Sequence, residues 1–179
     1  MKIHLLATPD DHRIATLAAV AIGLTLAEAA LPSPIPGVKP GLANIVTLAV
    51  LMRFGLGAAI WVGLLRVVAG SLLMGTFLSP TFFLSFTGAI TSLAVLAAAH
   101  RLPARYFGPV THSVLAAFAH MGGQLALVYF WLIPHAGVAY LLPLFAGAAL
   151  LFGTVNGVAA AFLLMRLPDT TPPLAYADR

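Results

Sequence analysis

The residues of this chain that could do chemistry are a few polar side chains set within long apolar stretches. Arg66 lies inside one stretch, and His120 and Gln124 lie four residues apart in another, which puts them on one face of a helix. A guanidinium binds carboxylates and phosphates through fixed N–H donors, whereas imidazole and amide groups form directional hydrogen bonds. These three side chains are therefore candidates for binding an anionic group of a small molecule.

Five more polar residues complete the candidate set. Lys39 would add positive charge for an anion unless it is only a solvated loop charge, and Asn44 would help orient the bound group. Thr76 and Ser79 fall in a turn between two apolar stretches, where they would gate the entrance of a pocket. The candidate substrate-binding residues are Glu28, Lys39, Asn44, Arg66, Thr76, Ser79, His120 and Gln124.

Several of these residues also have a purely structural interpretation. Glu28 and Arg66 would neutralise each other as a buried pair, since ionisable groups at membrane depth need a partner. His120 and Gln124 would join helices by hydrogen bonds. Asn44 would cap a helix or bond across helices. The sequence leaves both interpretations open.

The composition identifies the elements that must hold these side chains. Of the 179 residues, 61% are hydrophobic and 8% are charged, whereas soluble domains carry about 25% charged residues. This excludes a soluble domain and a disordered chain, and it predicts an integral membrane protein. The absence of Cys excludes disulfides, thiolate-bound metals and thiol nucleophiles. The net charge of +4 comes without a basic run, so nucleic acid is not an expected partner.

Six apolar stretches are predicted to be transmembrane helices, each of which needs about 20 residues to cross the bilayer. The second stretch is short, so we expect it to be tilted, kinked or partly re-entrant. The sixth contains Asn156 beside Gly153 and Gly157, a group that we interpret as a helix-packing site. The predicted spans are Ile14–Leu31, Gly41–Phe54, Ala58–Leu73, Pro80–Ala99, Pro109–Ile133 and Val138–Met165.

Positive charges predict the orientation, because cytoplasmic segments are enriched in Lys and Arg. With the N-terminus in the cytoplasm, Lys39 alone lies in an outer loop, and Arg66 lies within a span. Both termini are then cytoplasmic, and most polar residues of the spans lie in the outer half or at mid-depth. The positive residues predicted to lie on the cytoplasmic side are Lys2, Arg13, Arg53, Arg101, Arg105, Arg166 and Arg179.

The predicted domain organisation is simple. Residues 1–13 form a cytoplasmic N-terminal segment, residues 14–166 the six-helix transmembrane domain, and residues 167–179 a disordered cytoplasmic tail. An alternative is a signal peptide cleaved near Ala27-Glu28-Ala29, but the apolar run is long for that purpose and five more spans follow it.

Catalytic motifs are absent from the sequence. There is no phosphate-binding G-x-x-x-x-G-K-[ST] loop, no H-E-x-x-H metal motif and no aspartate-rich cluster in the spans. Asp10 and Asp11 are adjacent, but they lie outside the spans on the predicted cytoplasmic side, away from the proposed pocket. We therefore expect no enzyme activity, no catalytic residues, no metal and no cofactor.

Three segments carry a resemblance to a known family. They are residues 36–44 (PGVKPGLAN), residues 75–82 (GTFLSPTF) and residues 119–124 (AHMGGQ), together with Arg66. Their order and spacing resemble the Gx transporter family, also labelled heptaprenyl diphosphate synthase component I, over roughly residues 14–166. Pro40 and Met121 depart from the expected Leu and Asn.

The resemblance implies a role and partners. The family is grouped with the S components of energy-coupling-factor (ECF) transporters, which are compact six-helix proteins of the bacterial cytoplasmic membrane. Such a protein captures a small, cofactor-like or isoprenoid-related molecule from outside and docks on a transmembrane coupling subunit driven by ATPases. Ala15 and Ala19 are similar to the small-residue docking face of S components.

Two other hypotheses stay open. The first is a membrane accessory protein of isoprenoid, quinone or flavin-linked redox metabolism that binds a prenyl or quinone compound without transporting it. The second is a purely structural membrane subunit of a redox or flavin-handling complex. In the first hypothesis, Arg66 would hold the headgroup of the bound compound.

Overall fold

The computed structural model describes residues 8–31, 40–103 and 107–166, and within these ranges every regular element is helical. Five of its helical segments are long and apolar enough to cross a membrane, and α2 is a shorter apolar helix. The chain is therefore a multi-pass helical membrane protein, as predicted. The elements are α1 (Pro9–Ala30), α2 (Leu42–Phe54), α3 (Leu56–Leu73), α4 (Pro80–Ala99), α5 (Pro109–Leu127), a π-helical turn η1 (Val128–Leu132), a 3₁₀ helix η2 (Ala136–Leu141) and α6 (Leu142–Arg166).

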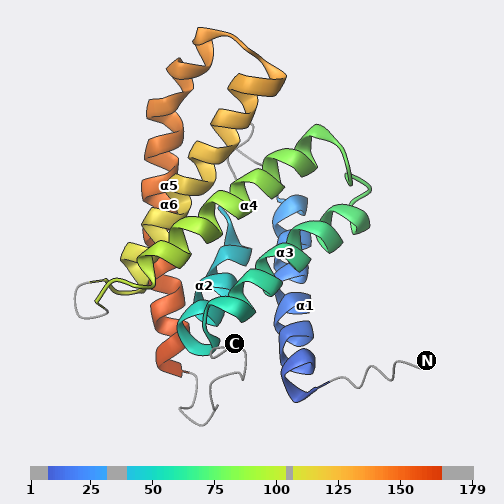
Figure 1. Cartoon of the computed structure of the whole chain (residues 1–179), viewed down its shortest axis with the longest axis vertical. Coiled ribbons are helices and arrows are strands. Elements are labelled where there is room, and N and C mark those ends of the chain that lie inside the picture. Colours follow the sequence, from blue (N-terminus) through green and yellow to red (C-terminus); the bar gives the residue numbers. More distant parts are fainter. Residues whose placement is uncertain (1–7, 32–39, 104–106, 167–179) are drawn as a thin grey trace.

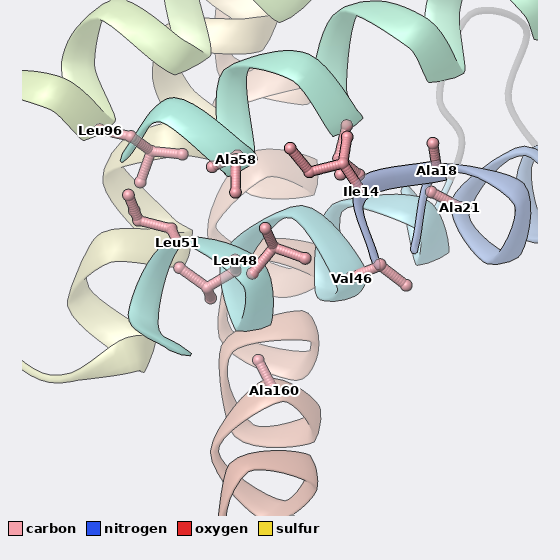
Figure 2. Packing of buried hydrophobic residues seen from close by; sticks show 12 residues of the cluster. Ile14, Ala18, Ala21, Val46, Leu48, Leu51, Ala58, Leu96 and Ala160 are labelled. Atoms are coloured by element: carbon pink, nitrogen blue, oxygen red, sulfur yellow. The ribbon is translucent and has the colours of Figure 1, made fainter. Parts of the chain in front are cut away.

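The short helix α2 lies at the centre of the bundle (Figure 1). It packs against α1, α3, α5 and α6, and its residues from Val46 to Leu51 are all buried. A helix that is apolar on all sides is stable only when other helices surround it. Figure 2 shows the resulting core, in which Leu48 and Leu51 of α2 lie with Ile14 of α1 and Ala58 of α3.

Two glycines set the limits of α2. Gly41 and Gly55 have φ angles of +73° and +86°, a backbone conformation that favours glycine over residues with a Cβ atom. The 13 residues between them span only about 20 Å at 1.5 Å per residue. Because the hydrocarbon core is about 30 Å thick, the helix α2 alone is too short to span it, in agreement with the short second stretch of the sequence.

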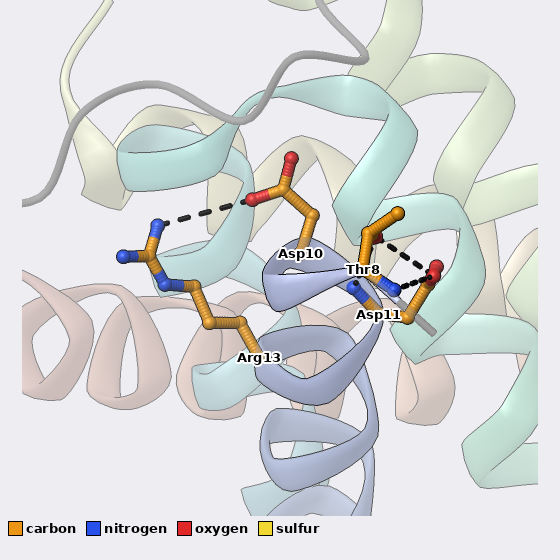
Figure 3. A network of polar contacts seen from close by, with 4 residues as sticks. All are labelled: Thr8, Asp10, Asp11 and Arg13. Atoms are coloured by element: carbon orange, nitrogen blue, oxygen red, sulfur yellow. Dashed lines mark hydrogen bonds and ion pairs between the residues drawn. The ribbon is translucent and has the colours of Figure 1, made fainter. Parts of the chain in front are cut away.

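Helix α1 begins before the predicted start at Ile14. Thr8 caps it reciprocally with Asp11: the backbone N–H of Asp11 donates to Thr8 Oγ1 (3.2 Å), and the backbone N–H of Thr8 donates to Asp11 Oδ2 (2.8 Å; Figure 3). Pro9 occupies the first helical position, where its missing N–H costs nothing. Asp10 also pairs with Arg13, at 3.9 Å. This capping box was not recognised in the sequence.

Helices α5 and α6 form a long antiparallel pair (Figure 1). A Cβ atom at Gly157 would lie 2.6 Å from Val110 Cα, and one at Gly153 would lie 2.9 Å from Val114 Cα. The two backbones therefore touch where glycine allows them to, the usual arrangement of small residues between membrane helices. The start of α1 and the end of α6 lie at the same end of the bundle, as the predicted topology requires.

Candidate functional site

A cavity of about 350 Å³ lies between the helices, and residues from all six α-helices line it. A volume of this size is within the range of small-molecule sites. Its apolar walls include the aromatic rings of Phe82, Phe145 and Phe152. The polar side chains of its walls are Thr25, Glu28, Asn44, Thr47, Arg66, Ser71, Thr76, Thr81, Ser85, Ser92, Ser113, His120, Gln124 and Asn156.

Arg66 of α3 is the cationic residue of this wall, and its side chain is fixed by α2. Its Nη2 donates a hydrogen bond of 2.9 Å to Asn44 Oδ1. Arg66 is only 9% exposed. Its Nε is buried and has no hydrogen-bond partner among the described residues. A guanidinium has five N–H donors, and the bond to Asn44 uses one of them.

The backbone at the start of α2 is held from both sides by buried side chains. Glu28 of α1 accepts a hydrogen bond from the backbone N–H of Gly41. Asn156 of α6 donates from Nδ2 to the carbonyl oxygens of Pro40 (2.7 Å) and Gly41 (3.3 Å). These contacts bring α1, α2 and α6 together at one point of the cavity wall.

The proposed ion pair between Glu28 and Arg66 is not formed in the described part of the chain. Arg66 donates to Asn44, Glu28 accepts from Gly41, and no nitrogen–oxygen distance within 4.0 Å joins the two charged side chains. The two charges nevertheless lie close enough to attract each other. The wall therefore contains one positive and one negative side chain that are separated rather than paired.

His120 of α5 lies against the backbone of α4. A Cβ atom at Gly88 would lie 2.7 Å from His120 Nε2, so only glycine leaves room for the ring there. The other ring nitrogen, Nδ1, is buried and has no partner within the described ranges. Gln124 lines the cavity one turn further along α5, as the four-residue spacing predicts.

The two residues of the predicted gate differ in their positions. Thr76 lines the cavity, whereas Ser79 is not part of its wall. The Ser79 hydroxyl donates to the Thr76 carbonyl (2.6 Å) and accepts from the backbone N–H of Phe82 (3.4 Å), so it caps α4. The second of these bonds occupies a backbone N–H in the first turn of α4, the helix that begins at Pro80.

Three further candidates lie elsewhere. Lys39 is outside the described residues, so its contribution to the site stays a prediction. Ala15 and Ala19 are exposed on α1 and face away from the core that Ile14 and Ala18 enter. Exposure of these two small residues leaves them accessible for a partner.

Asn156 is the residue that the sequence interpretation undervalued. We expected a packing site because two glycines flank it, and those glycines do pack against α5. Its own side chain, however, lies in the cavity wall and holds the Pro40–Gly41 backbone. The signal available in the sequence was a strongly polar amide within an apolar span.

Within the described ranges, no three His, Asp or Glu side chains gather as a metal site.

Comparison with known proteins identifies the family. A family model described as heptaprenyl diphosphate synthase component I matches residues 17–163. The chain belongs to this family. No curated protein and no solved structure matches the chain. The description names component I as one part of a synthase system. The matched range contains α2 to α5 completely and nearly all of α6, together with the residues that line the cavity.

Proposed function

We propose that this chain is an S-component-like substrate-binding subunit of the bacterial cytoplasmic membrane, which captures a small cofactor-like or isoprenoid-related molecule from outside for uptake. The observation that carries the proposal is the cavity with Arg66 in its wall. Buried arginines are costly unless something compensates their charge, and Arg66 lines the cavity with Asn44 as its hydrogen-bond partner among the described residues. An acceptor group of the ligand, such as a carboxylate, fits this position.

The remaining candidate residues would complete the binding site. Asn44 holds Arg66 in position, and His120 and Gln124 supply further hydrogen bonds from α5. Thr76 lies in the wall between α3 and α4, where a solute from outside would enter. Lys39 would attract an anion to this entrance. In this role the chain binds its ligand and does not transform it, although the family description contains the word synthase.

Uptake would require partner subunits. The sequence has no nucleotide-binding loop, so a coupling subunit and ATPases of the ECF type would supply the energy. The exposed Ala15 and Ala19 of α1 are the proposed docking face, because small residues allow another helix to approach closely. Ala15→Leu with Ala19→Leu should then reduce ATP-driven uptake in reconstituted vesicles and leave ligand binding unchanged.

The experiment that tests the binding function is native mass spectrometry of the protein purified from its own membrane. A co-purifying small polar molecule that is displaced by excess of the same compound supports the proposal. A prenyl diphosphate or a quinone in its place supports the alternative, an accessory protein of isoprenoid or quinone metabolism. That alternative is favoured by the family description and by Phe82, Phe145 and Phe152, which would contact an isoprenoid tail.

A further inference from the structure

The two charged side chains of the cavity wall are held apart by the first turn of α2. The Glu28 carboxylate accepts a hydrogen bond from the backbone N–H of Gly41. Arg66 Nη2 donates to Asn44 Oδ1 at 2.9 Å. Gly41 and Asn44 belong to one turn, because the Asn44 N–H donates to the Gly41 carbonyl at 2.8 Å. Each charge is therefore anchored to a different position of the same turn.

This turn is itself fixed by α6. Asn156 Nδ2 donates to the carbonyl oxygens of Pro40 (2.7 Å) and Gly41 (3.3 Å). Gly41 also has no room for a side chain, since a Cβ atom there would lie 2.8 Å from Asn44 Nδ2. The turn thus keeps the carboxylate and the guanidinium at separate positions of the wall.

Both charged groups keep an atom that a ligand can reach. Arg66 Nη1 and Glu28 Oε2 have no hydrogen-bond partner among the described residues. In the same part of the chain, the unpartnered polar atoms that are completely buried are Arg66 Nε, His112 Nε2 and His120 Nδ1. Nη1 and Oε2 are not among these atoms, so they retain exposed surface. Since both residues line the cavity, it offers a guanidinium donor and a carboxylate acceptor.

The charges of the wall predict the charge of the ligand. Arg66 and Glu28 are the two formally charged residues among the described residues that line the cavity, and their charges cancel. Separated charges at membrane depth are costly unless each finds a partner. A ligand with one negative and one positive group compensates both side chains. An anion, in contrast, compensates Arg66 but is repelled by the Glu28 carboxylate.

We propose that the cavity selects a small zwitterion, a molecule that carries a carboxylate and an ammonium group on one apolar body. The carboxylate bonds to Arg66, and the ammonium group bonds to Glu28. The apolar body contacts rings of the wall such as Phe82 and Phe152. Amino-substituted aromatic or aliphatic acids have this pattern. The inference rests on the proposed function and narrows its class of ligand.

The test is equilibrium binding of purified protein to two matched sets of compounds, each a zwitterion, the acid without its ammonium group and the amine without its carboxylate. In the first set, phenylalanine, 3-phenylpropanoate and 2-phenylethylamine, the two charges of the zwitterion are adjacent. In the second, 4-(aminomethyl)benzoate, 4-methylbenzoate and benzylamine, they lie at opposite ends of a ring.

In at least one set the zwitterion should bind at least tenfold more tightly than both relatives, because each relative lacks one hydrogen bond to a charged group. A smaller preference in both sets, or no binding by any of the compounds, overturns the inference. The proposed function is judged separately, by whether a small polar molecule co-purifies with the protein.

Variants of the two charged residues assign the preference. Glu28→Gln keeps an acceptor for the Gly41 N–H but removes the negative charge, so the preference for the zwitterion over its acid should fall below twofold. In Arg66→Gln, the preference over the amine should fall below twofold, and this variant decides the question if Glu28→Gln does not fold. Asp10→Asn is the matched control, since Asp10 lies in the same helix as Glu28 and outside the cavity wall. Tenfold preferences that persist in the folded site variants overturn the assignment to Glu28 and Arg66.

Discussion

At the scale of single residues, the site depends on a few buried polar groups that are each held by another helix. Arg66 is fixed by Asn44, and Gly41 is held between Glu28 and Asn156. The sequence could indicate that these residues are special, because each stands alone in an apolar stretch. The sequence could not indicate which residues bond to each other, because bonded residues such as Asn156 and Pro40 are 116 positions apart.

The contact between Asn44 and Arg66 gives the first prediction. Asn44→Ala removes the acceptor that orients the guanidinium, so ligand affinity should fall about tenfold, the equivalent of one hydrogen bond to a charged group. Isothermal titration calorimetry with the molecule identified by mass spectrometry measures this affinity. Thr154→Ala is the control, because the Thr154 hydroxyl is exposed and bonds only to the Leu150 carbonyl of its own helix among the contacts described. Affinity unchanged in Asn44→Ala would show that Asn44 does not orient Arg66 for binding.

Gly41 gives a prediction about stability. Gly41→Ala places a Cβ atom 2.8 Å from Asn44 Nδ2 on a backbone with φ of +73°, and the left-handed conformation alone costs about 1–2 kcal/mol. Unfolding in sodium dodecyl sulfate should therefore occur at a lower detergent fraction. Gly23→Ala, at an open helical position of α1, should be neutral or stabilise by up to about 1 kcal/mol. Equal effects of the two substitutions would contradict the strained start of α2.

At the scale of elements, the positions of proline and glycine indicated where several helices begin or end. Pro80 and Pro109 begin α4 and α5, and Gly41 and Gly55 bound α2. The exact course of the chain between α5 and α6 was not predictable, because the π-helical turn η1 and the 3₁₀ helix η2 depend on how the two long helices meet. Neither conformation has a clear periodicity in the sequence.

The close packing of α5 and α6 gives an element-scale prediction. Gly157→Ala forces the two helices apart, because its Cβ atom would lie 2.6 Å from Val110 Cα, and such overpacking costs about 1–3 kcal/mol. The thermal midpoint in detergent should fall. Gly147→Ala, in the same helix with open space around it, is the control. A midpoint that falls equally in both variants would contradict close packing at Gly157 as the cause, because Ala has a higher helix propensity than Gly and should not destabilise the open position.

At the scale of the whole molecule, composition and charge predict a helical bundle with an orientation, and the bundle is found. The start of α1 and the end of α6 lie at one end, as the topology requires. The central place of the short helix α2 was not predictable, since its sequence is as apolar as that of its neighbours and does not reveal which helix the others surround.

The orientation is testable because the natural chain contains no Cys. A single Cys at His135 should react with a membrane-impermeant maleimide in intact cells, since this position follows α5 on the predicted outer side. A Cys at Leu102, exposed after α4, should react only after the cells are made permeable. The reverse labelling pattern would invert the topology and place the Thr76 side of the cavity in the cytoplasm.

The central claim is that the cavity around Arg66 binds a solute, and equilibrium binding to two arginine variants tests it most directly. Arg66→Ala removes the cation of the cavity wall, whereas Arg101→Ala removes an exposed arginine outside it. With the co-purifying molecule as the probe and folding checked by thermal unfolding, affinity should fall at least a hundredfold in Arg66→Ala and stay within twofold in Arg101→Ala. A folded Arg66→Ala protein that binds the molecule as tightly as the natural chain would contradict the claim.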